Sequence, residues 1–390
     1  MDLRLIYLAR NLTRNFRRTL LTCAAVALPI TIFVLSTGVV DGVQRFLDNS
    51  VKQLRLAVTQ KTSIIVMLPE GHRRKIESLD QTGGHIVAVC GMRWIGGQRA
   101  NDPKPLSTLC VDADTYPVCF QESRMTQAEI DAWKRDRQAI LVGRSSAAEM
   151  GWKTGDRISI LPSVPPFTPM EFHVISTLPN AQDNITIWCR RDYFEEIAKK
   201  AGVPEGMLTF LFVKCATRED LDRYRVEIDK LFAGSLDETK TQDEKTFMNE
   251  FITQQFDLPR NLTILSALTV FVAIMAAMNT MSMNFRDRFN EMATLRSLGF
   301  GGRFAFAIVQ SESLLLCTVG GLIGAIAPYI AFNHTPLKNV TIPLIQSLEI
   351  MPKTCLKAVA IAIFIGILAA IWPSWLAFRL NVVRALRNLE

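Results

Sequence analysis

Long uncharged stretches of apolar residues divide the chain. Four windows contain no Asp, Glu, Lys or Arg: residues 19–40, 261–285, 313–332 and 358–378. A hydrocarbon core about 30 Å thick needs roughly 20 apolar residues in a helix, so each window can cross a membrane. We therefore predict transmembrane helices at 19–40, 261–285, 304–333 and 358–378. A cleaved signal peptide is the alternative for the first window, but its apolar run exceeds the roughly 7–15 residues of such peptides.

The segment between the first two predicted spans, residues 41–260, has mixed periodicity. Alternating or β-branched runs predict strands at 63–68, 85–94, 106–111, 139–142, 157–161, 170–178, 185–189 and 209–215. Helical spacing predicts helices at 126–136, 144–150, 192–201 and 217–232. Thr126 with Glu129 forms a capping-box pattern. We expect helical stalks at 41–56 and 245–256, a proline-rich loop at 162–169, and an exposed polar segment at 235–245.

The formal net charge of +7 gives the expected orientation. Residues 1–18 carry +4, residues 284–303 and 379–390 carry +2 each, and residues 41–260 carry −2. Positive residues near membrane ends mark the cytoplasmic side. Segments 1–18, 286–303 and 379–390 are therefore expected in the cytoplasm, and 41–260 and the short loop 334–357 outside it. The predicted fold is a membrane α-helical protein with four transmembrane helices and a large mixed α/β extracytoplasmic domain between helices 1 and 2.

The sequence lacks the patterns of a self-contained enzyme. It has no G-x-x-x-x-G-K-[ST] phosphate loop, no G-x-S-x-G elbow, and no histidines spaced for a metal ion. We therefore expect no catalytic residue, metal or cofactor in this chain. Basic residues form no stripe with aromatic residues, so nucleic acid is not an expected partner. Glu312, near the start of the third span, is a functional candidate by its position, but we favour a structural interpretation, in which it reaches the membrane interface or pairs with a nearby arginine.

Five of the eight cysteines fall in the predicted extracytoplasmic segment: Cys90, Cys110, Cys119, Cys189 and Cys215. An oxidising compartment could join two of them. Cys110 and Cys119 are the nearest in sequence and form the candidate disulfide. The alternative is that all five are small buried residues.

The loop after the second span predicts a short amphipathic helix. Phe289, Met292, Leu295 and Leu298 recur at helical spacing among charged residues, and Gly299 follows as a helix end. One interpretation is an interfacial helix that anchors the loop. The other is a docking helix for a cytoplasmic partner.

This loop also carries a resemblance to a known family. The run E-M-A-T-L-R-S-L-G, from Glu291 to Gly299, resembles the E-x-A-x-L-R-A-L-G motif of the MacB/FtsX/LolCE-type (type VII) ABC transporter permeases. Residues 10–21, 140–158, 172–175 and 373–387 resemble further family patterns. Ser297 replaces the commoner Ala, and Val383 stands where Pro is frequent. Unlike MacB, the chain has no fused nucleotide-binding domain, so the resemblance implies a separate ATPase subunit.

The resemblance implies a device that transmits motion through a bacterial inner membrane. A cytoplasmic ABC ATPase, holding ATP and magnesium, would drive a pair of permease protomers and reshape their extracytoplasmic domains, with a possible periplasmic adaptor or lipoprotein. The residues expected to dock the ATPase are Arg288, Glu291, Met292, Leu295, Arg296, Leu298 and Gly299. The expected cargo is hydrophobic, a lipid, a lipoprotein or a peptide. Regulation of a cell-wall hydrolase, as in FtsX, and a sensory role are the alternatives.

Small residues recur in the last two spans. Gly320 and Gly324 form a G-x-x-x-G pattern, and Ala362, Gly366 and Ala370 repeat every four residues. Such residues let membrane helices approach closely. The contacts they make could lie within one protomer or between two.

Overall fold

The computed structural model describes residues 16–81, 83–99, 102–178, 184–335 and 348–379. Residues 1–15, 336–347 and 380–390 of the predicted segments 1–18, 334–357 and 379–390 therefore lie outside the described residues, and Val383 is among them. The chain divides into two compact units. We call residues 1–42, 257–340 and 347–390 the helical bundle, and residues 43–256 the α/β domain.

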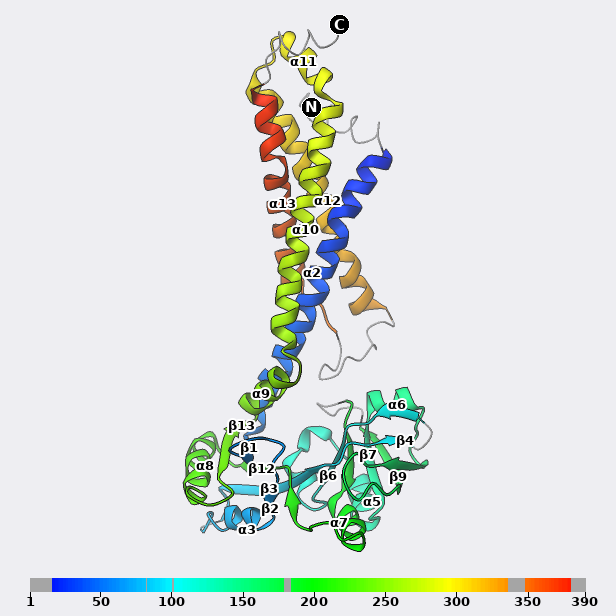
Figure 1. The fold of residues 1–390 in the computed structure, drawn as a ribbon, viewed down its shortest axis with the longest axis vertical. Coiled ribbons are helices and arrows are strands. Elements are labelled where there is room, and N and C mark those ends of the chain that lie inside the picture. Colours follow the sequence, from blue (N-terminus) through cyan, green and yellow to red (C-terminus); the bar gives the residue numbers. More distant parts are fainter. Residues whose placement is uncertain (1–15, 82, 100–101, 179–183, 336–347, 380–390) are drawn as a thin grey trace. The chain divides into compact units, whose positions relative to one another are not determined.

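Long helices make up the helical bundle. They are α2 (Phe16–Ser50, which continues into the α/β domain), α10 (Leu258–Asp287), α12 (Gly302–His334) and α13 (Pro352–Phe378), with the short α11 (Phe289–Ser297) between α10 and α12. Within the described residues, four helices are long and apolar enough to cross a membrane. They contain the four windows expected from the sequence, and Figure 1 shows them running alongside one another in the bundle.

One large mixed sheet organises the α/β domain, in the order β13-β1-β12-β3-β6-β10-β7-β9-β8-β4-β5. Its strands are β1 (Arg55–Gln60), β3 (Ile86–Trp94), β4 (Gln98–Arg99), β5 (Asp102–Pro105), β6 (Thr108–Val111), β7 (Ala139–Gly143), β8 (Arg157–Leu161), β9 (Met170–Leu178), β10 (Ile187–Arg190), β12 (Phe210–Cys215) and β13 (Thr239–Asp243). A second, small sheet pairs β2 (Leu68–Pro69) with β11 (Met207–Leu208).

Helices cover this sheet and carry the domain's connections (Figure 1). They are η1 (Val51–Gln53), α3 (Gly71–Glu77), α4 (Tyr116–Cys119), η2 (Gln121–Ser123), α5 (Gln127–Arg135), α6 (Arg144–Met150), α7 (Arg191–Lys200), α8 (Arg218–Leu231) and α9 (Glu244–Phe256). The capping box predicted at Thr126 and Glu129 is confirmed at the start of α5, and a second one opens α8 at Thr217 and Asp220. In both, a hydroxyl and a carboxylate satisfy backbone N–H groups that the helix leaves unpaired.

Three expectations for the α/β domain are wrong in whole or in part. The helical stalk expected at 41–56 ends earlier, because η1 ends at Gln53 and Arg55 and Leu56 already belong to β1. Residues 63–68 do not form a strand: Ile65 and Val66 are exposed in a loop, and pairing begins only at Leu68 in β2. Residues 235–245 are not simply an exposed polar segment, because β13 pairs with β1. The carboxylate of Asp229 accepts bonds from the buried hydroxyls of Thr239 and Thr241, so a polar sequence can form this strand.

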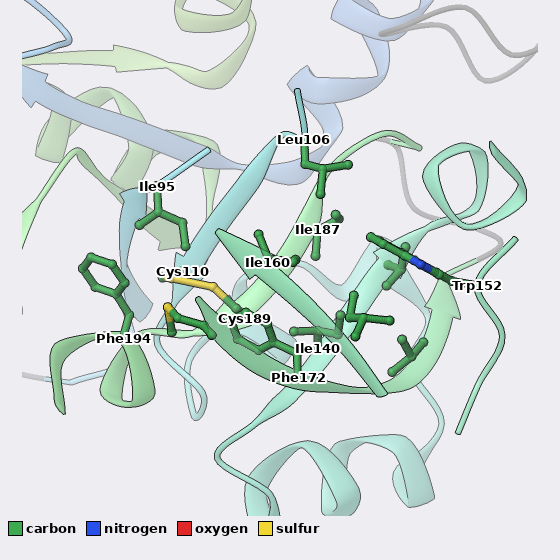
Figure 2. Close-up of a cluster of buried hydrophobic side chains, with 14 of the residues drawn as sticks. Ile95, Leu106, Cys110, Ile140, Trp152, Ile160, Phe172, Ile187, Cys189 and Phe194 are labelled. Atoms are coloured by element: carbon green, nitrogen blue, oxygen red, sulfur yellow. A yellow bond between two sulfur atoms is a disulfide. The ribbon is translucent and has the colours of Figure 1, made fainter. Parts of the chain in front are cut away.

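The expected disulfide between Cys110 and Cys119 is also wrong. Cys110 is joined to Cys189, whereas Cys119 is a buried free thiol. Cys110 lies on β6 and Cys189 on the neighbouring parallel strand β10, in direct register. Strand pairing thus brings together residues 79 positions apart, at a Cα–Cα distance of 4.6 Å that a disulfide accepts. Figure 2 shows the bond within an apolar cluster that includes Ile140 and Phe172.

Candidate functional site at the α11 turn

The short helix α11 is packed against the ends of three long helices. Its buried residues Met292 and Ala293 belong to an apolar cluster. The rest of that cluster comes from α10, α12 and α13: Phe285, Ala305, Ile308, Val309 and Ala377. Because an apolar interior is close-packed and resists deformation, α11 is held firmly against these helices.

A buried ion pair reinforces this packing. Arg288, between α10 and α11, places Nη1 2.6 Å from Oε2 of Glu312 in α12. The amide of Asn284 donates to the other Glu312 oxygen at 2.8 Å, and Arg288 Nε donates to Glu291 at 3.1 Å. Arg288 is 8% exposed and Glu312 6%. Of the two structural roles expected for Glu312, pairing with a nearby arginine is the one that the structure shows. A small cavity lies beside the pair.

Arg296 lies where α11 meets the ends of α12 and α13. A Cβ built on Gly302 would lie 3.0 Å from Arg296 Nη1 and 2.7 Å from the carbonyl oxygen of Phe378. Only glycine therefore permits this close approach of α13 to the first turn of α12.

The exposed side of the turn differs from the buried one. Leu298 is 71% exposed and Phe300 44%, and the Phe300 ring stacks on Phe304 with centroids 4.8 Å apart. Gly299 between them has φ +92°, a left-handed conformation that favours glycine. Exposed apolar side chains grouped at a tight turn are suited to contact with another protein.

The structure separates the predicted docking residues by burial. Arg288 and Met292 are buried within the chain, Glu291, Leu295 and Arg296 are half-buried, and Leu298 and Gly299 are exposed. Sequence reasoning missed Phe300, and the helical spacing could not have found it because it follows the end of α11. Asn290 and Thr294 are also exposed on the helix.

The small residues of the last two spans make contacts inside this chain. A Cβ on Gly320 would lie 2.8 Å from the Cys23 carbonyl oxygen of α2, and one on Gly324 would lie 2.5 Å from that of Ala27. The G-x-x-x-G face is thus occupied by α2.

The repeat in α13 faces α12 in the same way. Ala362 is the residue that a Cβ on Gly321 of α12 would strike, and the carbonyl oxygen of Gly366 accepts a bond from Ser313 of α12 at 2.8 Å. Ala370 is fully buried. Gly321 was missed, because it lies one residue outside the four-residue repeat.

Comparison with known proteins found one matching family and two similar proteins. Residues 263–382 match the family described as FtsX-like permease C-terminal. The chain is 21% identical to an uncharacterized ABC transporter permease of Methanocaldococcus jannaschii, over 97% of the chain and 96% of that protein. It is 24% identical to the macrolide export ATP-binding/permease protein MacB of Syntrophobacter fumaroxidans, over 41% of the chain but only 22% of that protein.

Two solved structures are also similar. The periplasmic region of MacB from Actinobacillus actinomycetemcomitans matches 52% of the chain and 94% of its own length, with 10% identity and a TM-score of 0.34. The extracellular domain of the noncanonic ABC-type transporter YknZ from Gram-positive bacteria matches 48% of the chain and 99% of its own length, with 9% identity and a TM-score of 0.34.

Proposed function

We propose that the chain is an ABC transporter permease subunit driven by a separate cytoplasmic ATPase bound at the α11 turn. The match of residues 263–382 to the FtsX-like permease C-terminal family and the similarity to an ABC transporter permease along nearly the whole chain support this proposal. The proposed docking rests on one observation: the α11 turn has an exposed apolar side and a buried side. Leu298 and Phe300 are exposed for a partner, while Met292 and Arg288 are buried against the ends of the spans. A force applied from outside the chain at α11 would therefore move α10, α12 and α13 together.

The proposed orientation puts the α11 turn in the cytoplasm and the α/β domain outside it. The positive charge of segments 1–18 and 284–303 supports this direction. So does the Cys110–Cys189 bond, because disulfides persist in oxidising compartments outside the cytoplasm. Both termini would be cytoplasmic, and the membrane would be the inner membrane of a bacterial cell.

The proposed mechanism is mechanical rather than a passage through the spans. ATP and magnesium would bind the ATPase subunit, and their turnover would tilt the spans and change the α/β domains of two protomers. All four uncharged windows lack Asp, Glu, Lys and Arg, and Glu312, which directly precedes the third window, is paired with Arg288. A hydrophilic path is therefore not expected. Cargo of hydrophobic, lipid, lipoprotein or peptide character would be moved outside the membrane, with an adaptor or lipoprotein as a further partner.

The experiment that tests this function is co-purification of the tagged full chain from native cells, with partners identified by mass spectrometry. We expect an ABC-type ATPase with the native chain and its loss with Leu298→Asp. Leu236→Asp is the matched control, because Leu236 is fully exposed in the α/β domain. An ATPase retained by both Leu298→Asp and Phe300→Asp would overturn the docking site. Co-purification of a cell-wall hydrolase would instead favour regulation of that hydrolase over transport.

A further inference from the structure

Two connections join the α/β domain to the long helices, and they leave from adjacent strands. The first passes from α2 through η1 into β1, which begins at Arg55. The second passes from β13 into α9, which begins at Glu244. Strands β1 and β13 are antiparallel neighbours, with Leu56 opposite Asp243. The first residue of β1 and the first residue of α9 therefore lie at the same end of the same strand pair.

Arg55 binds the second connection directly. Its Nε donates to Oε2 of Glu244 at 2.7 Å and its Nη2 to Oε1 at 2.8 Å. The Arg55 side chain is 1% exposed and that of Glu244 5%. A bidentate contact of this kind fixes direction as well as distance, because the guanidinium plane matches the carboxylate.

The same guanidinium also binds the body of the domain. Nη1 donates to the carbonyl oxygen of Cys119 at 2.7 Å, and Nη2 lies 2.5 Å from a carboxylate oxygen of Glu122. The group stacks over the Phe120 ring, 4.1 Å from its centroid. These partners come from α4 and η2, which follow β6 in sequence. One side chain thus contacts three separate parts of the domain.

The charges around Arg55 are balanced. Lys214 adds a second cation, and its ammonium donates to the carbonyl oxygen of Gln53 in η1 at 2.7 Å. Burial lowers the pKa of the Lys214 ammonium, and the charge of Arg55 lowers it further. Burial alone would also lower the pKa of Arg55, but the carboxylates of Glu244 and Glu122 raise it, so this cation stays charged. Two cations therefore face two carboxylates.

We propose that Arg55 is a positioning residue that fastens both connections to the α4–η2 segment, so that movement of the long helices reaches the α/β domain as one displacement. This inference rests on the proposed function, because it concerns how the ATP-driven motion is delivered. An apolar cluster could hold the same parts together without the expense of desolvating charges. An apolar contact is not directional, however, whereas the planar Arg55 guanidinium fixes the direction of the Glu244 carboxylate through two parallel bonds.

The first test measures the distance between the two connections in the absence of any ATPase. Spin labels at Gln44 of α2 and Thr253 of α9, both exposed, report the distance between the two connections in the full chain. We expect one narrow distance in the native chain and in Lys245→Gln. Lys245 pairs with Asp48 between the same two helices, but this pair is exposed and serves as the matched control. Glu244→Gln, which removes the charge and keeps the shape, should lose the narrow distance.

The second test adds the ATPase and ATP. Labels at Gln44 and at the exposed Glu219 of α8 report movement of the domain relative to its connection. Glu244→Gln should keep ATPase co-purification and ATP hydrolysis but lose the ATP-dependent distance change that the native chain and Lys245→Gln retain. Arg55→Lys, which keeps the charge but not the planar fork, should be intermediate.

Two results would overturn the proposal: an unchanged distance distribution in Glu244→Gln, or an equal loss in Lys245→Gln. Unfolding of Glu244→Gln would be visible as a lost cooperative thermal transition, and Arg55→Lys then carries the comparison. If no ATPase binds the native chain, the proposed function fails, while the ATPase-free measurement still decides whether Arg55 fastens the junction.

Discussion

The Glu312 carboxylate lies 2.6 Å from the Arg288 guanidinium, and both side chains are buried where α10, α11 and α12 converge. Arg288 also pairs with Glu291 at 3.1 Å, and Glu312 accepts a bond from Asn284, but the Arg288–Glu312 contact is the shortest of these ion pairs and hydrogen bonds. Breaking a buried pair from one side is far more damaging than replacing both members, because the remaining charge stays desolvated.

Glu312→Ala should therefore lower the free energy of unfolding of the bundle by about 3–5 kcal/mol. The double variant Glu312→Leu with Arg288→Met should lose much less, because no charge is left buried. Thermal unfolding of the full chain in detergent measures both. Equal losses in the single and double variants would show that the pair contributes only through packing.

Gly324→Ala should weaken the contact between α2 and α12. The added Cβ would lie 2.5 Å from the Ala27 carbonyl oxygen, a backbone atom that cannot rotate away. A cost of about 1–3 kcal/mol is typical of overpacking, and a lowered unfolding midpoint would report it. Gly301→Ala is the matched control, since nothing lies within 4 Å of a Cβ there. A normal midpoint for Gly324→Ala would mean that α2 is not held against this face.

Cys189→Ser should destabilise the α/β domain by about 2–5 kcal/mol, because the bond closes a long loop. Reducing agent should lower the unfolding midpoint of the native chain and leave that of the variant unchanged. Cys355→Ser provides the control, as Cys355 is a free thiol in the bundle. Sensitivity of Cys189→Ser to the reductant would point to another disulfide.

Arg93→Met should stabilise the α/β domain. Arg93 is 4% exposed, Nη1 has no hydrogen-bond partner among the described residues, and the guanidinium stacks on Phe194 at 4.8 Å. Burial lowers the pKa of this arginine, which means that its charge is unfavourable in place. The nearby charge of Glu195 raises the pKa of Arg93 but does not offset burial, so removing this buried charge should raise the unfolding midpoint.

Arg190→Met is the contrasting control for Arg93. Arg190 is comparably buried but donates to the carbonyl oxygens of Trp133 and Lys134 and pairs with Asp192. Its replacement should lower the midpoint. A lower midpoint for Arg93→Met as well would show that Arg93 is compensated by a group still to be found.

Asp80 should make the stability of the α/β domain depend on acid. Its carboxylate accepts the backbone N–H groups of Ile86, His85 and Gly83, and these bonds hold its pKa below the usual value. A lowered folded-state pKa stabilises the fold above the unfolded-state value of about 3.9 and loses that effect as the pH falls further. The midpoint difference between the native chain and Asp80→Asn should therefore be constant near neutral pH and shrink below about pH 4. A constant difference at all pH values would contradict this role.

The sequence predicts best those features that depend on neighbouring residues. The spans follow from uncharged windows, and the capping box at Thr126 from a spacing of three residues. The α11 motif was found in the same way. Features that depend on contacts between residues far apart in the sequence could not be predicted. They are the disulfide partner of Cys110 and strand β13, whose polar residues form a strand only beside β1 and Asp229.

The sequence predicted where the candidate site lies, but not which of its residues are buried and which are exposed. Helical spacing placed Met292 and Leu298 on one face, yet the first is buried and the second exposed. The reason is that α11 ends at Ser297, so Leu298 no longer follows the helical repeat. The Arg55 cluster could not be found at all, because its members are separated by up to 189 residues and only the sheet brings them together.

The pairing of β1 with β13 gives the α/β domain the architecture of an exchangeable cassette. Its first and last strands are neighbours, so the whole unit is inserted through two adjacent points of one strand pair. Insertions with closely spaced ends disturb their host little. Recombination at these two points would exchange the whole α/β domain while leaving the sequences of the four long helices unchanged.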